Sequence, residues 1–448
     1  MTRTAPLLAL LLAGLAAAEP PKLPAELDKP LELFKAGKFD PCLEELRKAT
    51  QANPTLRPPR LILAEWFAQA NRPQDARLNL ERAIVEDPTH PEGYLMNANV
   101  AFGEGRVTDA LLSLRHAQTL AADVRWTAAQ KKRFLLETRL GLATCLESRG
   151  NAAGVRETLQ AVLADDPKNG AVRARLANAL FGQGKPDEAF AELTKAHADD
   201  PVVELPELRM AALWTAKANG AAKLADARAH REEAEGWLKK AVAAHPKSAK
   251  PLRAYANWLL DDGRADAAAP YVEAAVKLEP TARDTLAVSG VLARHKKDFA
   301  AAATVFESLY KDAPNDPFAV GNLAISLAES GDAEKQKRAI NLAVALVQQN
   351  PRSPDAAAVL GWCKLKAGRV DEAEEHLLAV LKAGGTMSLD ALYFAGKLLS
   401  DRKKYEDAQK VLKAALDARG AFVYRPDAGA LLAEVVKLVP AKKDEPKK

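Results

Sequence analysis

Apolar residues recur along this chain in short amphipathic stretches that are separated by turn residues. One such stretch carries Leu252, Tyr255, Ala256 and Leu259. Residues at these spacings lie on one face of an α-helix, so the stretch is predicted to be a helix with one packed side and one solvent-exposed side. Similar stretches follow one another from about residue 24 to residue 420. The pattern therefore predicts a chain built almost wholly from helices.

The stretches repeat with a period close to 34 residues. The segments 38–54, 72–88, 185–201 and 264–280 align without gaps. A small or apolar anchor residue marks the same position in every unit, and six of the ten spacings between anchors are 34, the others being 35, 37 and two of 45. The anchors are Cys42, Ala76, Ala110, Val155, Ala189, Ala234, Ala268, Ala302, Ala339, Ala373 and Ala408. A period of this size predicts about eleven tandem units.

Turn residues divide each unit into two helices. A glycine lies five residues before many anchors, where it suits a left-handed helix cap, and a proline lies twelve residues after most of them, where it ends the second helix. The glycines are Gly37, Gly105, Gly150, Gly184, Gly263 and Gly368. Because a single helix pair buries too little apolar surface to fold alone, each unit is expected to pack against the next.

The irregular spacings have local explanations. Thr127 is a predicted N-cap, and the extra residues after it are expected to lengthen the first helix of the fourth unit as far as Ser148. In the sixth unit the extra residues follow Gly220 and are expected to lengthen the second helix. Pro30 indicates a shortened first unit, and residues 427–438 are expected to form a closing helix.

The unit as a whole resembles the tetratricopeptide repeat, which places a large residue, Leu, Gly or Ala, aromatic residues, Ala and Pro at fixed offsets over 34 residues. The resemblance covers roughly residues 24–420, although leucine or valine often replaces the aromatic residues. It implies an all-α fold, a right-handed superhelical solenoid of about eleven helix-turn-helix repeats. The composition agrees, with 48% apolar but only 6% aromatic residues.

We divide the chain by this pattern into a processing signal, three groups of repeats and a terminal region. The expected boundaries are 1–18 for a signal peptide, 19–120 for repeats 1–3, 121–246 for repeats 4–6 with the two insertions, 247–420 for repeats 7–11, 421–439 for a capping helix and 440–448 for a disordered, lysine-rich tail.

The N-terminus has the pattern of an export signal. Arg3 precedes an apolar stretch from Ala5 to Leu15, and small residues up to Ala18 suit cleavage before Glu19. We therefore expect an exported protein, periplasmic or secreted, without a membrane span. Cys42, Cys145 and Cys363 lie far apart at positions that are small or apolar in the other units, so we expect them to be buried, unreactive thiols.

Charge and motif patterns argue against several functional classes. The net charge of +5 comes from 64 basic and 59 acidic residues that are interleaved, which does not favour nucleic-acid binding. The seven histidines show no metal-ligand spacing, and most are expected to be solvated. No nucleophile elbow, phosphate loop or dinucleotide fingerprint occurs in the sequence. We expect neither an enzyme nor a bound metal or cofactor.

The resemblance implies that a ligand lies along the first helices of the repeats, where residues beside the packed face point into a groove. Asn99, Asn178 and Asn257 take one equivalent position there, and an amide can pair with a peptide backbone as donor and acceptor. Arg175, Lys250 and Arg253 are neighbours that would favour an acidic segment. Alternatively, the asparagines only bond within their own helix pair. A possible apolar groove comprises Phe318, Trp362, Leu365 and Tyr393.

The expected function is an exported scaffold or adaptor of the cell envelope that binds a peptide segment or tail of a partner protein in its concave groove. The alternative is an accessory subunit of a polysaccharide or outer-membrane export machine. A glycan groove would need exposed aromatic platforms beside acidic or amide groups, whereas a peptide groove can use amides and point charges. The sequence favours the peptide.

Overall fold

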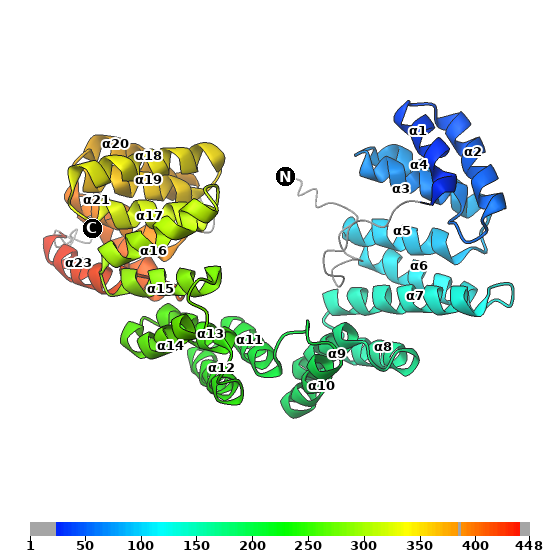
Figure 1. The fold of residues 1–448 in the computed structure, drawn as a ribbon, viewed down its shortest axis with the longest axis horizontal. Coiled ribbons are helices and arrows are strands. Elements are labelled where there is room, and N and C mark those ends of the chain that lie inside the picture. The colour runs from blue at the N-terminus through cyan, green and yellow to red at the C-terminus, as the bar shows by residue number, and fades with distance from the viewer. Residues whose placement is uncertain (1–23, 384–386, 440–448) are drawn as a thin grey trace, which may run out of the picture. The chain divides into compact units, whose positions relative to one another are not determined.

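The computed structural model describes residues 24–383 and 387–439, and within these ranges the chain is helical and contains no strand (Figure 1). The predicted signal peptide, residues 1–18, and the predicted tail, residues 440–448, lie outside the described residues. The chain divides into two compact units, residues 1–209 and 210–448. The all-α fold class is confirmed.

Unit 1 is a succession of helices in which each helix from α1 to α10 packs against the next. Its helices are α1 (Asp28–Lys35), α2 (Phe39–Ala52), α3 (Pro59–Gln69), α4 (Pro73–Glu86), α5 (Pro91–Gly103), α6 (Val107–Ala121), α7 (Ala128–Ser148), α8 (Ala152–Asp165), α9 (Gly170–Gly182) and α10 (Pro186–Asp199), preceded by a 3-10 turn, Ala25–Leu27. Helix α11 (Pro206–Asn219) runs across the division between the units.

Unit 2 continues the same arrangement, and each helix from α12 to α23 packs against the next. Its helices are α12 (Leu224–Ala244), α13 (Ala249–Asp261), α14 (Ala265–Leu278), α15 (Arg283–His295), α16 (Phe299–Asp312), α17 (Pro317–Ala328), α18 (Ala333–Gln349), α19 (Pro354–Lys366), α20 (Val370–Ala383), α21 (Leu389–Asp401), α22 (Tyr405–Asp417) and α23 (Arg425–Leu438). One apolar cluster extends from α16 to α23.

The repeat register of the sequence corresponds to the helix pairs. Every anchor residue lies on an even-numbered helix, the second member of a pair, and ten of the eleven anchors are at most 2% exposed. Odd-numbered helices also stack on one another, as α3 does on α5, α17 on α19 and α19 on α21. Helix pairs stacked in sequence, the core of the solenoid prediction, are confirmed, while the count of eleven stays a prediction.

The turns and insertions follow the predicted pattern. All six predicted glycines adopt φ angles between 68° and 77°, and Asn71, Lys297 and Lys403 take the same left-handed conformation at equivalent turns. Helix α7 has 21 residues, and Thr127 and Gln130 form a capping box at its start. Helix α12 also has 21 residues, whereas α1 has only eight and contains Pro30.

The three cysteines are buried and unpaired with one another, as predicted. None of the helices in the described part of the chain is long and apolar enough to cross a membrane.

Candidate functional site

The predicted groove residues of unit 1 lie on α5 and α9. Asn99 is exposed on α5, and its amide has no hydrogen-bond partner among the residues that the structure describes. Two positions earlier, Asn97 donates to Ser113 Oγ at 2.9 Å and so bonds within the α5–α6 pair. The alternative for the predicted asparagines was a hydrogen bond within their own helix pair. In the α5–α6 pair Asn97 makes such a bond, while the Asn99 amide faces solvent.

The other two groove residues of unit 1 are engaged by neighbouring side chains. Asn178 Oδ1 accepts a hydrogen bond from Arg209 Nη2 at 3.1 Å. Arg175 Nη2 lies 2.9 Å from a carboxylate oxygen of Glu147 and 3.0 Å from Thr144 Oγ1. These three contacts connect residues 28 to 31 positions apart, so they link one repeat to the next. A ligand would meet Arg175 as one half of an ion pair.

In unit 2 the predicted residues Lys250, Arg253 and Asn257 lie on α13. Lys250 and Asn257 are exposed, and no described residue hydrogen-bonds to the Asn257 amide. Arg253 is mostly buried, pairs with Glu279 and donates to Thr285 Oγ1 at 3.0 Å. The most accessible polar groups of the predicted groove are therefore Asn99, Asn257 and Lys250.

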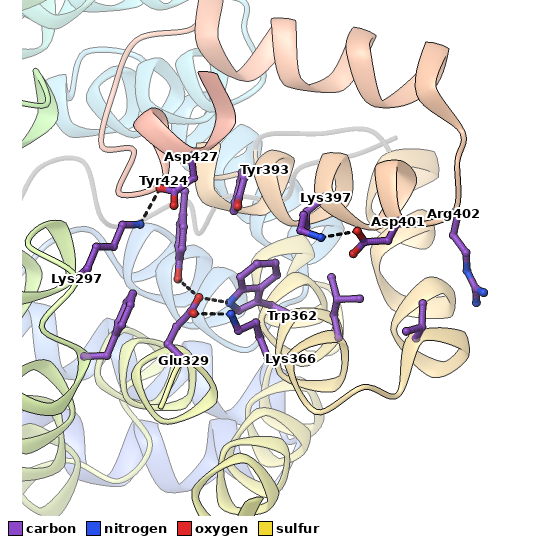
Figure 2. A pocket seen from close by; sticks show the side chains of 13 residues that line it. Lys297, Glu329, Trp362, Lys366, Tyr393, Lys397, Asp401, Arg402, Tyr424 and Asp427 are labelled. Carbon is purple, nitrogen blue, oxygen red and sulfur yellow. Dashed lines mark hydrogen bonds and ion pairs between the residues drawn. The ribbon is translucent and has the colours of Figure 1, made fainter. Parts of the chain in front are cut away.

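Three of the four residues of the predicted apolar groove come together in unit 2. Trp362, Leu365 and Tyr393 line one pocket of about 570 Å³ (Figure 2). Phe318 does not line this pocket. It is 44% exposed at the start of α17, and the edge of its ring contacts Phe306. Trp362 lies eleven residues before its anchor, which is the register position that Asn99 and Asn257 take in their repeats.

The aromatic rings of this pocket do not expose their faces to solvent. Trp362 is 3% exposed and Tyr393 is 7% exposed. Trp362 stacks on Phe394 with ring centroids 4.3 Å apart, and Tyr393 stacks on Tyr424 at 5.0 Å. Tyr424 belongs to the irregular segment 418–424, which connects α22 to α23, and its ring contacts both Trp362 and Tyr393.

Glu329 holds the covering segment in place beside the pocket. Its Oε1 accepts hydrogen bonds from Tyr424 Oη at 2.7 Å and from Trp362 Nε1 at 3.0 Å, while Lys366 Nζ lies 2.7 Å from Oε2 (Figure 2). The carboxylate is thus satisfied by two neutral donors and one ammonium group. It connects the end of α17 to α19 and to a tyrosine 95 residues further along the chain.

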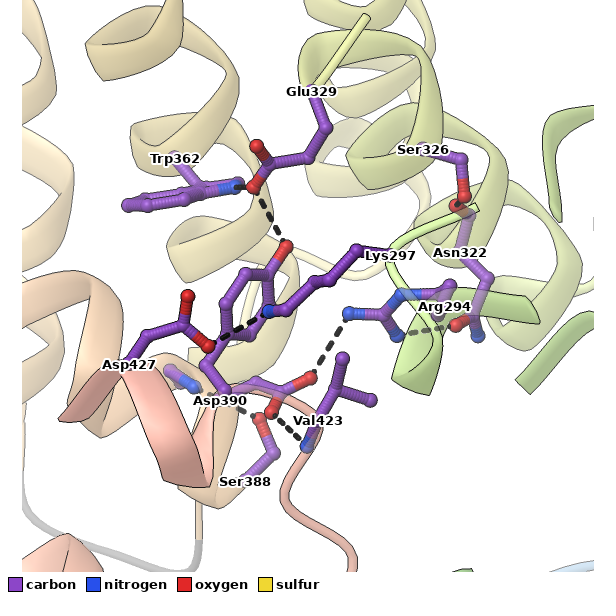
Figure 3. Close-up of polar contacts among 12 residues, drawn as sticks. Arg294, Lys297, Asn322, Ser326, Glu329, Trp362, Ser388, Asp390, Val423 and Asp427 are labelled. Atoms are coloured by element: carbon purple, nitrogen blue, oxygen red, sulfur yellow. Dashed lines mark hydrogen bonds and ion pairs between the residues drawn. The ribbon is translucent and has the colours of Figure 1, made fainter. Parts of the chain in front are cut away.

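A second polar cluster lies beneath the same segment (Figure 3). Arg294 on α15 is 5% exposed, donates to Asn322 Oδ1 at 2.6 Å and pairs with Asp390 Oδ2 at 3.0 Å. The other oxygen of Asp390 accepts the backbone N–H of Val423 at 2.9 Å. Nearby, Lys297 Nζ pairs with Asp427 at 2.7 Å. Helices α15 and α21, three repeats apart, therefore meet through charged groups.

The sequence predictions did not include Arg294, Asp390, Glu329 or Tyr424. One signal was present, because Arg294 lies eight residues before its anchor, and Phe34, Phe102 and Phe181 occupy that register position in other repeats. A cation at an apolar register position indicates a buried partner of opposite charge. Nothing in the repeat pattern identified the partner, which lies 96 residues away.

No cluster of side chains able to hold a metal ion is present in the described ranges. We expected most histidines to be solvated, but His90 and His295 are partly buried. This burial lowers the pKa of each imidazole to about 4. The His90 ring contacts Trp126 and accepts a hydrogen bond from the backbone N–H of Glu92 at the start of α5.

Comparison with known proteins gives matches at the level of repeats. Two tetratricopeptide repeat family models match the chain, one at residues 146–213 and 336–386, and the other at residues 254–317. No curated protein matches it. Stacked helix pairs with left-handed turns define an all-helical repeat array. With the family matches, the chain is a tetratricopeptide repeat protein. Such repeats generally form non-catalytic scaffolds that bind other proteins.

Solved structures are similar to this chain only at low sequence identity and low TM-score. Yeast Tom70 is 14% identical, with 94% of this chain and 96% of that chain covered and a TM-score of 0.36. A tetratricopeptide repeat protein from Parabacteroides merdae is 15% identical, with coverages of 67% and 99% and a TM-score of 0.38. The human IFIT1 dimer with m7Gppp-AAAA is 16% identical, with coverages of 78% and 86% and a TM-score of 0.40.

Proposed function

We propose that this protein is an exported, non-catalytic scaffold that binds an extended segment of a partner protein along the odd-numbered helices of its repeats. The observation that carries the proposal is the state of Asn99 and Asn257. These amides occupy one register position in different repeats, are exposed, and have no hydrogen-bond partner within the described chain. An amide in this state can donate to and accept from the backbone of a peptide without selecting its side chains.

The charged residues at neighbouring positions would influence which partner segments bind. Arg175 and Arg253 already pair with Glu147 and Glu279, so they would contribute to binding only by exchanging partners. Lys250 is exposed at the start of α13. The amides therefore provide most of the proposed affinity for a partner backbone, and the cations adjust the preference toward acidic segments.

The test is an affinity capture from envelope extract with the chain from residue 19 onward. The key variant carries Asn99→Ala and Asn257→Ala, and the matched control is Asn341→Ala, an exposed asparagine on the second helix α18. Proteins retained by the natural chain and the control but lost by the double variant would support the proposal. Equal retention by all three proteins would place the partner elsewhere and refute a role for the asparagines.

Export through residues 1–18 is part of the same proposal, because the basic, apolar and small-residue regions follow the order of a cleavable signal. N-terminal sequencing of the protein recovered from its natural host tests it. A chain beginning near Glu19 in the envelope or medium would support export, and an intact N-terminus in the cytoplasmic fraction would contradict it.

A subunit of a glycan export machine is the alternative and has less support. Sugar binding by stacking needs exposed aromatic faces, and the rings in the pocket of unit 2 stack on one another instead. Capture of a polysaccharide with no protein partner in the experiment above would favour this alternative.

A further inference from the structure

The closing helix α23 (Figure 1) has the sequence of a first helix of a repeat. Its residues 428–432, Ala-Gly-Ala-Leu-Leu, match residues 395–399 of α21, Ala-Gly-Lys-Leu-Leu. Ala428 and Val435 are fully buried in the apolar cluster of α16–α23. Helix α23 therefore resembles the first member of a helix pair, and no second member follows it within the described part of the chain.

The glycine of this motif marks where the second helix of a pair packs. A Cβ on Gly396 of α21 would lie 2.7 Å from the side chain of Leu412 on α22, and a Cβ on Gly290 of α15 would lie 2.7 Å from Phe306 on α16. At the equivalent Gly429 of α23, no described atom lies within 4 Å of such a Cβ. The place that a second helix takes in other pairs is thus open beside α23.

The sequence that follows α23 does not supply a suitable side chain. Leu412 and Phe306 each lie sixteen positions after their glycine, and the residue sixteen positions after Gly429 is Glu445. Residues 440–448 otherwise comprise lysines, one aspartate, two prolines and one alanine. Placing a charged side chain against an apolar helix face is unfavourable, so an apolar helix from another chain suits this position better.

The open face of α23 is apolar, unlike the outer face of the first helix of the array. Gly429, Leu432, Ala433 and Val436 follow one another at spacings of three and four and so share one face. Ala433 is exposed, and Val436 is 49% exposed. A helix that ends a repeat array normally has a polar outer face. The exposed residues of α1 follow this rule and are Asp28, Lys29, Glu32 and Lys35.

We propose that this face of α23 joins two copies of the chain as an antiparallel helix pair about a two-fold axis. When Gly429 opposes Val436 of the second copy, Leu432 opposes Ala433 of the second copy in the same register. Each large residue then meets a small one, which is the self-complementarity that a two-fold interface requires. An antiparallel pair also places the opposite ends of the two helix dipoles side by side.

The inference goes beyond the proposed scaffold function, because it concerns the pairing side of the last helix and uses none of the groove asparagines. A dimer of this kind would carry two complete repeat arrays and two peptide grooves. Two linked grooves bind a partner with two suitable segments more tightly than one groove does. The dimer is nevertheless measured without any partner, so failure of the peptide proposal leaves its test unaffected.

Sedimentation velocity over a concentration series tests the dimer, with the natural chain measured in full and from residue 19 onward. One 14-residue helix per copy makes a small interface, so we expect a dissociation constant on the order of 10 µM. Val436→Glu places a carboxylate in the apolar face and should raise this constant at least about 100-fold. The matched control is Val344→Glu on α18, where the valine is 37% exposed, and it should dimerise like the natural chain.

A natural chain that remains monomeric at about 100 µM, or equal dimerisation of all three proteins, would overturn the proposal. Circular dichroism checks that both variants keep the helical content of the natural chain. A monomeric natural chain that captures a different protein, lost in Val436→Glu, would assign the face to that protein and would also overturn the proposal.

Opposite charges at position 433 test the antiparallel register. The two-fold axis passes between positions 432 and 433, so the two copies of residue 433 lie beside one another. Ala433→Glu and Ala433→Lys should therefore each oppose dimerisation, because like charges meet. An equimolar mixture should associate at least about 10-fold more tightly than either variant alone, because opposite charges then meet. A mixture that associates no better than its components would refute this pairing.

Discussion

Arg294 and Asp390 are 96 positions apart in sequence, and their side chains form an ion pair of 3.0 Å that is almost fully shielded from solvent. The pair joins α15 to the start of α21, with two helix pairs between them in the chain. In a linear repeat array each unit contacts mainly its neighbours. This contact therefore adds a long-range constraint to unit 2 that near-neighbour stacking does not provide.

Removing one member of this pair should be much more costly than removing both. Asp390→Ala leaves the Arg294 guanidinium buried without its counter-ion and the Val423 N–H without its acceptor, so we expect a loss of about 3–5 kcal/mol. The double change Arg294→Met with Asp390→Leu should recover much of this loss. Urea unfolding followed by circular dichroism measures both. Asp401→Ala, which breaks the exposed pair with Lys397, is the control and should cost less than about 1 kcal/mol.

Acid should destabilise the protein through His90 and His295. Burial lowers the pKa of each folded-state imidazole to about 4 from an ordinary value of 6.5. Between these values the unfolded chain binds more protons than the folded chain, so stability falls as pH decreases from about 6.5 to about 4, by at most about 3 kcal/mol per histidine.

The variants His90→Asn and His295→Gln test this pH dependence. Asparagine preserves an acceptor for the Glu92 N–H at the start of α5. Unfolding free energies at pH 7.5 and pH 4.5 should differ less in the double variant than in the natural chain. An unchanged difference would assign the acid sensitivity to other groups.

The capping box of the lengthened helix α7 should contribute measurably to its stability. Thr127 Oγ1 accepts the Gln130 N–H, and the Gln130 side chain accepts the Thr127 N–H at 3.0 Å. Thr127→Ala removes the first bond and should cost about 1 kcal/mol, while Thr127→Ser should cost much less. Thermal unfolding of the two variants measures this difference. If Thr127 did not act as a cap, both variants would lower the unfolding temperature equally.

Close packing of α19 on α20 requires the absence of a side chain at position 361. A Cβ at Gly361 would lie 2.6 Å from Leu377 Cγ, so Gly361→Ala should separate the helices and cost about 1–3 kcal/mol. Gly429 in α23 has no atom within 4 Å of such a Cβ, and Gly429→Ala should instead stabilise the protein by up to about 1 kcal/mol. Denaturation midpoints that shift in the same direction for both variants would contradict the predicted difference between Gly361 and Gly429.

The periodic features of the fold could be predicted from the sequence because they depend on local interactions. The anchors, the left-handed turns, the cap at Thr127 and both lengthened helices follow from residue spacing and backbone preference. The closing helix was also predicted, although it begins at Arg425 rather than at Asp427. Exposure of the Asn99 and Asn257 amides follows from the same register.

The environment of Trp362 and Tyr393 could not be predicted in the same way. The register rule predicts that both residues face an open groove, whereas both are almost fully buried. Tyr424 covers them, and its position depends on contacts to Glu329 and Tyr393 that are set by the path of an irregular segment. Residue periodicity contains no information about a segment that is outside the repeats.

The burial of the three thiols has a practical consequence. Cys42, Cys145 and Cys363 are almost completely inaccessible, and burial raises the pKa of all three, that of Cys42 to about 11. At neutral pH they remain protonated and out of reach of maleimide reagents, since the thiolate is the reactive form. A cysteine introduced on the surface of either unit would then be the one site that reacts, so the natural chain is already suited to carry paired fluorophores or spin labels without prior removal of its own cysteines.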